Sequence, residues 1–535
     1  MGGPAISADS SVVGEATNQR TPARGRGADT SGRDERWALG RYRQTKATKR
    51  GGKDGRESEQ FVVAVKAGNR SEGPAGAKGL PDTESLEGKM QGNSGPNSVS
   101  TKQQRIAELA RQMPEKAMTS LSYHMDLEWM FEAYRRTRKD GAAGIDGRTA
   151  KDYEANLESN LRSLLDRAKS GDRYKAPPVR RVHIPKGDGS TRPLGIPTFE
   201  DKVLQRAVVM ALEPLYEQDF LDCSYGFRPG RSAHQALREV QSRLTLMGGG
   251  WVLDVDLRKF FDTLDHRHLR ETLAKRMRDG VIERLIGKWL NAGFMEGSML
   301  SFPESGTPQG GVVSPLLANI YLHEVIDAWF EQEVRPRMRG RAFMIRYADD
   351  LVMGFSREED ARRVMTVLPK RLERYGLTLH PDKTRLLDFR SPRNRKDSDD
   401  DEGPGNFDFL GFTHHWAKSR KGNWVVKQKT ASSRFTRAMK RMKGWLRSVR
   451  HLPIPTQHKA LCQKLRGHYG YYGITGNSHG IARFRFLVTR LWKKWLGRRS
   501  NRAHMNWERF KRILERHPLP LARIPHPIYR PAANP

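Results

Sequence analysis

Cysteine is scarce in this chain of 535 residues, which has only Cys223 and Cys462. The two form no C-x-x-C pair, so we expect neither a disulfide framework nor a cysteine-rich zinc site. No uninterrupted apolar run approaches the roughly 18 residues that span a membrane, and the N-terminus lacks the apolar core of a signal peptide. Ile6 stands where a myristoylation signal needs Ser or Thr. These absences favour a reducing interior compartment.

Apolar and acidic residues are also few. Hydrophobic residues make up 36% of the chain, below the usual globular share, so part of the chain is expected to be unfolded on its own. The formal net charge is +35 and the isoelectric point is near 10.3. A basic excess of this size indicates a polyanionic partner, most often nucleic acid. A non-enzymatic binder of the ribosomal or chromatin type would carry a similar charge.

The charge is distributed unevenly along the chain. Residues 1–100 hold 16 Lys and Arg against 12 Asp and Glu, with little apolar periodicity, and we expect them to be disordered. Residues 431–535 hold 24 Lys and Arg against only Glu508 and Glu515. Tryptophans and tyrosines interleave with these charges, a combination that suits phosphates and unpaired bases. Most of the tryptophans are nevertheless expected to pack in a small helical core.

Two adjacent aspartates, Asp349 and Asp350, lie between the apolar, β-prone runs 342–347 and 351–353. This pattern predicts a hairpin with a pair of carboxylates at its tip. Like charges side by side repel, and a divalent cation such as Mg²⁺ both removes the repulsion and uses the oxygens as ligands. An isolated Asp-Asp pair is more often an acidic surface turn, so the motif needs support from the rest of the chain.

A second apolar run, Trp251–Asp256, predicts a strand that ends in a carboxylate. If Asp256 faces the hairpin across one sheet, three carboxylates converge, which is enough charge for two Mg²⁺ ions and phosphoryl transfer. Asp254, two residues earlier, lies on the same face of a regular strand as Asp256. It could be an outer group of the metal site or simply a polar residue at the end of the strand, and we favour the latter.

Other patterns predict a hairpin over 178–197 with basic residues near its tip, and helices over 267–290 and 314–332. The glycines of 306–311 allow close backbone approach to a ligand.

Eight segments in order resemble reverse transcriptases, and in particular the variant encoded inside bacterial group II introns. They are Lys139–Gly147, Leu194–Pro197, Ser224–Ser232, Asp256–Asp262, Thr307–Gly310, Tyr347–Asp350, Gly376–Thr384 and Phe407–Phe412. The resemblance extends over about residues 105–525, and Leu465–Asn477 is similar to the thumb and maturase domain of the same family.

The resemblance implies an α+β fold of the right-hand polymerase type. We expect a disordered extension over 1–100, an N-terminal extension and fingers over 101–250, a palm with the metal site over 251–425, and a helical thumb or maturase RNA-binding domain over 426–535. The fingers and palm are expected to contain antiparallel sheet.

The resemblance also assigns roles to single residues. Asp256, Asp349 and Asp350 are the expected catalytic and metal-binding triad for two Mg²⁺ ions. The residues expected around the incoming nucleotide are Lys186, Arg192, Phe261, Gln309 and Gly310. Phe261 matches the aromatic gate that excludes a ribose 2′-hydroxyl, which favours dNTPs. Lys186 and Arg192 could instead be ordinary solvated charges of a turn. Phe261 could instead be a residue that only packs in the core.

By the same resemblance, the protein is an RNA-directed DNA polymerase that binds its group II intron RNA, assists its splicing as a maturase and copies it into DNA. Its expected partners are that RNA, a DNA target and primer, and dNTPs, with no membrane. The expected location is the bacterial cytoplasm, at the nucleoid when the protein acts on DNA. Many relatives carry a Cys/His-rich endonuclease, which we do not expect here because neither cysteine lies in a ligand cluster; the primer would then come from elsewhere.

Two other functions remain open from the sequence. A domesticated reverse transcriptase could serve DNA repair or phage defence, and a ribozyme-like RNA fold beside the gene would argue against it. An RNA-splicing chaperone could retain the polymerase fold without its activity, but the intact set of Asp256, Asp349 and Asp350 argues against that. Nothing in the sequence indicates the oligomeric state.

Overall fold

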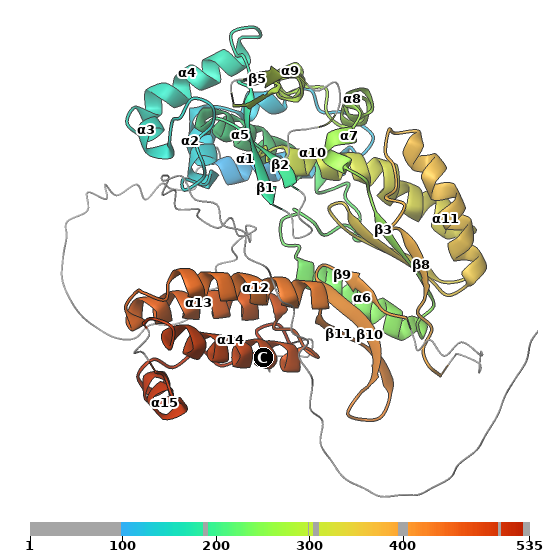
Figure 1. Cartoon of the computed structure of the whole chain (residues 1–535). Helices are drawn as coiled ribbons and strands as arrows, with labels where there is room; N and C mark the ends of the chain where they lie inside the picture. Colours follow the sequence, from blue (N-terminus) through green and yellow to red (C-terminus); the bar gives the residue numbers. More distant parts are fainter. Residues whose placement is uncertain are drawn as a thin grey trace, which may run out of the picture. The chain divides into compact units, whose positions relative to one another are not determined.

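The computed structural model describes residues 98–527, with gaps in that range. The gaps are 186–190, 298, 303–305, 307–309, 394–404 and 501–503. All described residues belong to one compact unit, residues 75–535. The expectation of disorder over residues 1–100 falls almost wholly outside the described residues, but its last two positions already belong to the helix that begins at Val99. What is described is a mixed structure of helices and mainly antiparallel sheets (Figure 1).

A four-stranded antiparallel sheet carries both aspartate segments. Its strand order is β6-β7-β3-β8, with β3 Trp251–Asp256, β6 Ala342–Tyr347, β7 Asp350–Phe355 and β8 Arg385–Asp388. Side chains of β3 alternate between two buried clusters: Leu253 and Val255 pack in one and Val252 in the other. Both faces of the sheet are therefore covered, which explains why its strands read as continuous apolar runs.

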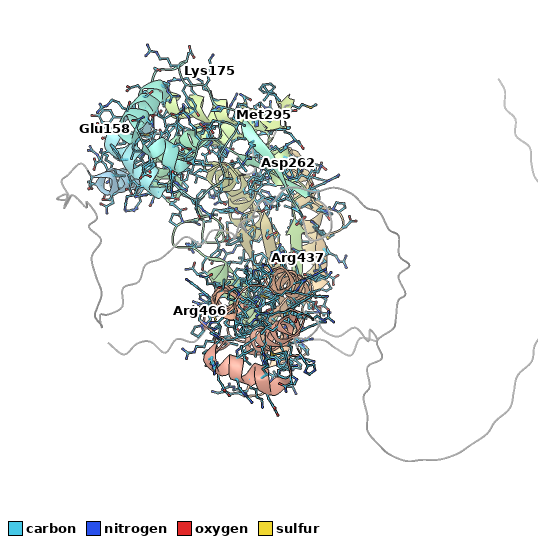
Figure 2. All side chains as sticks on the ribbon, turned by 60° about the vertical axis from the view of Figure 1, so that its left-hand side comes forward. Glu158, Lys175, Asp262, Met295, Arg437 and Arg466 are labelled. Atoms are coloured by element: carbon cyan, nitrogen blue, oxygen red, sulfur yellow. The ribbon has the colours of Figure 1, made fainter. Side chains whose placement is uncertain are left out.

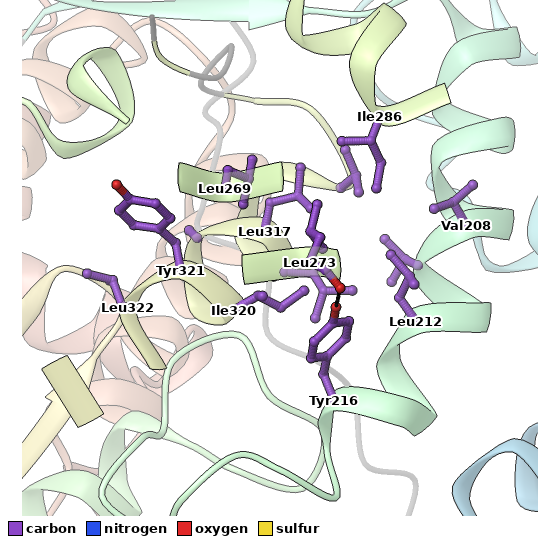
Figure 3. Close-up of a cluster of buried hydrophobic side chains, with 14 of the residues drawn as sticks. Val208, Leu212, Tyr216, Leu269, Leu273, Ile286, Leu317, Ile320, Tyr321 and Leu322 are labelled. Atoms are coloured by element: carbon purple, nitrogen blue, oxygen red, sulfur yellow. Dashed lines mark hydrogen bonds between the residues drawn. The ribbon is translucent and has the colours of Figure 1, made fainter. Parts of the chain in front are cut away.

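The larger buried cluster is formed chiefly by helices. In Figure 3, α5 (Phe199–Tyr216), α8 (His266–Ala274) and α10 (Ser314–Leu322) meet in it, and the Tyr216 hydroxyl donates a hydrogen bond of 3.3 Å to the Leu273 carbonyl. The other α-helices that the structure describes before residue 430 are α1 (Val99–Gln112), α2 (Leu127–Arg136), α3 (Ala150–Glu154), α4 (Leu157–Lys169), α6 (Ala233–Met247), α7 (Phe260–Thr263), α9 (Gly280–Leu290) and α11 (Glu358–Glu373).

The predicted hairpin over 178–197 is present. Strands β1 (Val179–Pro185) and β2 (Thr191–Ile196) pair antiparallel. They belong to a four-stranded sheet of order β2-β1-β4-β5, which continues with β4 (Phe294–Glu296) and β5 (Met299–Ser301). The β1–β4 pair is parallel, so this sheet is mixed rather than purely antiparallel.

The helix predicted over 267–290 is in fact two helices, α8 and α9. The break occurs because Asp279 caps a new helix: its Oδ1 accepts hydrogen bonds from the backbone N–H groups of Val281 and Ile282, at 3.0 and 3.1 Å. An aspartate at this position satisfies N–H groups that have no partner inside the helix. The apolar period alone does not reveal such a restart.

The helix predicted over 314–332 is α-helical only as far as Leu322. Wider π-helical turns follow over His323–Ala328 and Phe330–Val334. Such turns are rare in proteins, and those that occur are often found at functional sites. They redirect side chains relative to a regular α-helix. Here they contain Asp327, whose side chain is fully buried and pairs with Arg346 of β6.

The C-terminal region begins with a three-stranded sheet and continues as helices. The strands are β9 (Phe407–Phe409), β10 (Phe412–Lys418) and β11 (Trp424–Thr430), and the helices are α12 (Ser432–Ser448), α13 (Ile454–Tyr472), α14 (Ser478–Leu496) and α15 (Trp507–Arg516). As expected, Trp492 and Trp495 are buried in the core of these helices, whereas Trp507 is 49% exposed. Within the described ranges, no helix has the length and apolar character needed to cross a membrane.

Candidate active site

Asp256 and Asp350 lie directly opposite each other in the central sheet. Asp256 is the last residue of β3 and Asp350 the first of β7, and the antiparallel register pairs the two. Opposed residues of antiparallel strands point to the same face, with Cβ atoms about 4.5–5.5 Å apart. The structure therefore brings together two carboxylates that are almost one hundred positions apart in the sequence.

Asp349 lies in the two-residue turn that joins β6 to β7. Tyr347 pairs with Asp350, so Ala348 and Asp349 form the tip of the predicted hairpin. Ala348 has φ +56°, a left-handed conformation that costs a non-glycine residue about 1–2 kcal/mol. Such a cost persists only where neighbouring groups hold the backbone in place.

Arg346 supplies that support. Its guanidinium has five N–H donors, and each has an acceptor in the structure. Nη1 donates to the Ala348 carbonyl at 3.1 Å and to Asn319 Oδ1 at 3.0 Å, and Nη2 donates to Ser224 Oγ at 2.8 Å. Nε and Nη2 form a two-pronged ion pair with Asp327, at 2.7 and 2.5 Å. Arg346 therefore connects the strained turn to two distant segments, the one that holds Ser224 and the continuous helical one that holds Asn319 and Asp327.

The charge of Arg346 is preserved by its partner. Both Arg346 and Asp327 have completely buried side chains. Burial alone would lower the pKa of Arg346, but the contact with Asp327 holds it above its ordinary value. Removing one member of such a pair leaves an uncompensated buried charge, which typically costs about 3–5 kcal/mol.

The segment that follows Cys223 packs directly on the turn. The N–H of Tyr225 donates to the Arg346 carbonyl at 2.9 Å, and a Cβ at Gly226 would lie 2.3 Å from the Ala348 nitrogen. Only glycine fits that approach. The next residue, Phe227, is 59% exposed at φ +58°, with its ring 6.5 Å from that of Tyr347.

The aspartates repel one another. Burial, then repulsion from Asp349, Asp256 and Asp254, raises the pKa of Asp350 to about 7. Burial likewise raises the pKa of Asp349, against the opposing charge of Arg192. The site therefore holds more negative charge than its immediate surroundings neutralise.

Two basic residues near β8 partly offset this charge. Lys383 Nζ lies 3.0 Å from Asp256 Oδ2, and Arg385 Nε lies 3.4 Å from Asp254 Oδ2. Burial raises the pKa of Asp254 to about 6 in spite of Arg385. Asp254 thus has a basic partner of its own, as Asp256 does, and its place outside the metal-binding set stays a prediction.

The donor set fits a divalent cation. Over the described part of the chain, no three His, Cys, Asp or Glu side chains are grouped as ligands of one metal ion. Asp256, Asp349 and Asp350 are nevertheless hard oxygen donors whose mutual repulsion a cation would relieve, and carboxylate oxygens are the ligands that Mg²⁺ uses in proteins.

The residues predicted around the nucleotide are described only in part, because Lys186 and Gln309 lie outside the described residues. Arg192, on β2, is exposed and acts electrostatically on Asp349. Gly310 has φ +115°, and a Cβ there would lie 2.4 Å from the Gly195 carbonyl of β2. Phe261 is 9% exposed and makes an edge-to-face contact with Phe260, with ring centroids 5.1 Å apart.

Sequence reasoning missed Arg346 and two of its partners, Asn319 and Asp327. A signal was present, because Arg346 is a charged residue inside an otherwise apolar strand. A buried strand tolerates such a residue only with a charged partner elsewhere. The identity of that partner could not be read from the sequence.

Comparison with known proteins gives consistent matches. The family model described as reverse transcriptase (RNA-dependent DNA polymerase) matches residues 184–414. Protein YkfC of Escherichia coli is 38% identical over 287 residues, which cover 46% of this chain and 75% of YkfC. Group II intron-encoded protein LtrA of Lactococcus lactis subsp. cremoris is 37% identical over 224 residues, 42% of this chain and 37% of LtrA. The mitochondrial nuclear intron maturase 2 of Arabidopsis thaliana is 26% identical over 330 residues, 52% of this chain and 43% of that protein.

Proposed function

The chain belongs to the reverse transcriptase family, with an RNA-directed DNA polymerase domain, and on this premise we propose that it binds a group II intron RNA, assists its splicing and copies it into DNA. The observation that carries the polymerase part is the pairing of Asp256 with Asp350 beside Asp349 in the turn. The names of the similar proteins LtrA and nuclear intron maturase 2 support the intron and maturase parts.

We assign Asp256, Asp349 and Asp350 as the residues that would hold two Mg²⁺ ions. When bound, such ions activate a primer 3′-hydroxyl and neutralise charge on the leaving pyrophosphate. The protein holds two of the carboxylates on rigid strands and the third on a turn anchored by Arg346. Arg192 would meet the negative triphosphate, as its effect on the pKa of Asp349 indicates a position near the carboxylates.

We further propose a right-hand arrangement for the described unit. The β1–β2 hairpin and the helices before it would be the fingers and N-terminal extension, and the β6-β7-β3-β8 sheet the palm. Helices α12 to α15 would belong to the thumb or maturase domain predicted over residues 426–535. The Tyr471 hydroxyl of α13 donates to the Leu410 carbonyl at 2.8 Å, which ties the helical region to the β9–β10 turn.

The C-terminal helices would provide the main RNA-binding surface. Figure 2 shows long side chains, Arg437 and Arg466 among them, around these helices. Positive charge of this density binds phosphates by releasing counterions, so it suits a structured RNA irrespective of sequence. We place the protein in the bacterial cytoplasm, in keeping with the bacterial sources of YkfC and LtrA, and at the nucleoid during DNA synthesis.

Primer extension on an RNA template with dNTPs and Mg²⁺ tests the polymerase proposal. The full chain is expected to extend a DNA primer annealed to RNA, and splicing of the intron that encodes it is expected to accelerate in its presence. Absence of extension from well-folded protein would reject the polymerase proposal. Extension without any effect on splicing would reject the maturase proposal alone.

Phe261→Val is expected to relax discrimination against rNTPs, by about 10-fold or more, if the Phe261 ring excludes the 2′-hydroxyl. This magnitude is typical for a pocket that rejects an analogue by packing. Steady-state incorporation of a single dNTP or rNTP measures the ratio. Phe260→Val is a matched control, because Phe260 is the adjacent buried ring. Equal sugar selectivity in the two variants would contradict the assignment of Phe261.

A further inference from the structure

A cavity of about 430 Å³ opens between three of the C-terminal helices. Met439 of α12 and Trp507 of α15 lie on two sides of it, and α14 contributes the rest of the lining. The α14 residues are Leu487, Arg490, Leu491, Lys493 and Lys494. A volume of this size falls within the roughly 300–1,000 Å³ usual for small-molecule sites.

The cavity combines an aromatic ring with unpaired positive charge. Trp507 is 49% exposed, although tryptophans in this region are otherwise mostly buried. Lys493 Nζ lies 4.7 Å from the centroid of its ring. Among the described residues, neither Arg490, Lys493 nor Lys494 makes an ion pair with a carboxylate. Cations with no acidic partner beside an open apolar surface are suited to an anionic ligand that also has a flat apolar part.

The exposed position of Trp507 is held by the fold. Trp507 is the first residue of α15, which Asn506 caps by accepting a hydrogen bond of 2.9 Å from the Arg509 N–H. The helix is anchored by Phe510, which is completely buried and packs edge-to-face on Trp492 with centroids 5.8 Å apart. Trp507 contacts Phe510 in the same way, at 5.9 Å. The ring is thus fixed at the rim of the cavity without being needed to fill the core.

We propose that this cavity binds an unpaired nucleobase of RNA, with Trp507 as the stacking surface and Arg490, Lys493 and Lys494 as contacts to the adjoining phosphates. The proposal rests on RNA binding by the proposed function and goes further by naming a site and its ligand. A nucleotide has the required chemistry, because its base is flat and its phosphate is negative. Proteins that bind single strands use such pairs of aromatic and basic residues. Inside a base-paired helix the faces of the bases are covered by neighbouring base pairs, so those bases could not stack on the Trp507 ring.

Binding of the full chain to two labelled RNAs, a short oligoadenylate and a blunt-ended duplex, tests the site. Trp507→Ala is expected to weaken oligoadenylate binding on the order of 10-fold, the usual effect of losing one stacked base. Duplex binding should stay within about two-fold, because phosphate contacts dominate it. Trp507→Phe should retain most of the affinity. Tyr123→Ala is the control, because it removes an aromatic side chain before α2 that is 81% exposed. It should leave the affinity for both RNAs unchanged.

Charge variants keep the test independent of any effect of Trp507 on folding. Arg490→Gln and Lys494→Gln alter exposed side chains of α14. Each is expected to lower the slope of log affinity against log salt by about 0.7 for the oligoadenylate, one phosphate contact apiece. An oligonucleotide with abasic sites should bind the parent protein and Trp507→Ala equally.

Two results would overturn the site. One is unchanged oligoadenylate affinity in Trp507→Ala, and the other is an equal loss for both RNAs. If Trp507→Ala loses more affinity for oligodeoxyadenylate than for oligoadenylate, the ligand of the site is single-stranded DNA instead. Primer extension by the parent protein is measured separately. Failure of the polymerase proposal would appear in that assay, and failure of the nucleobase-site proposal would appear in the binding assays.

Discussion

Asp349→Asn is expected to reduce primer extension on an RNA template by on the order of 10²–10³-fold or more. The change keeps the size and most hydrogen bonding of the side chain but removes the charge that would hold Mg²⁺. Groups that stabilise developing charge in a transition state contribute about that much to the rate. The loss should appear in kcat rather than in primer–template affinity, because the substitution is small and lies at the turn between β6 and β7.

Asp140→Asn is the control for this experiment. Asp140 is a carboxylate with a 70% exposed side chain, paired with Arg138 and remote in sequence from the turn. Its replacement is expected to leave extension unchanged. Splicing assistance should survive Asp349→Asn, since the chemistry of splicing is proposed to belong to the RNA. Extension at the parent rate by Asp349→Asn would disprove the assignment of the metal-binding triad.

Arg346→Met is expected to cost about 3–5 kcal/mol of folding free energy, because it leaves Asp327 buried without a counter-charge. Extension should fall as well, because the Ala348 carbonyl loses the hydrogen bond that Arg346 Nη1 donates to it. Thermal unfolding measures the first effect and primer extension the second. Arg341→Met is the control: Arg341 is an exposed arginine just before β6, and its loss should change neither property appreciably.

The double variant Arg346→Met with Asp327→Leu separates stability from positioning. Replacing a buried ion pair by apolar residues of similar size is often neutral or stabilising, so most of the lost stability should return. Extension should stay reduced by about 10-fold or more, because the turn remains without its anchor and small misplacements of reacting groups are costly. Arg346→Lys keeps the charge with fewer donors, and should raise the Mg²⁺ concentration needed for half-maximal extension. Full recovery of extension in the double variant would show that Arg346 serves folding alone.

The local elements of the site could be predicted from the sequence. The apolar runs around Asp349 and Asp350 predicted the hairpin, and the run before Asp256 predicted β3. The hairpin at 178–197 was equally clear, because its turn residues and alternation are local. Each of these features depends on neighbours within a few residues, and a sequence displays those directly.

Features that depend on distant partners could not be predicted in this way. The π-helical turns after Leu322 interrupt an apolar period that continues through the region, and Asp327 in them pairs with the distant Arg346. The restart at Asp279 is different, because its cap is local and was concealed only by the continuous apolar period. Apart from the nearby Ala348 carbonyl, the acceptors of Arg346 are distant in the sequence: Ser224, Asn319 and Asp327.

The sequence by itself determined the kind of protein this is: a strongly basic chain with ordered polymerase-like motifs and three candidate carboxylates. Only the tertiary structure decided that Asp256 stands opposite Asp350, that a buried arginine anchors the turn beside them, and that Trp507 lies at the rim of a cationic cavity. The physical reason is register and packing. A strand's composition predicts that it will pair, but which residues face each other is set by the contacts of the whole fold.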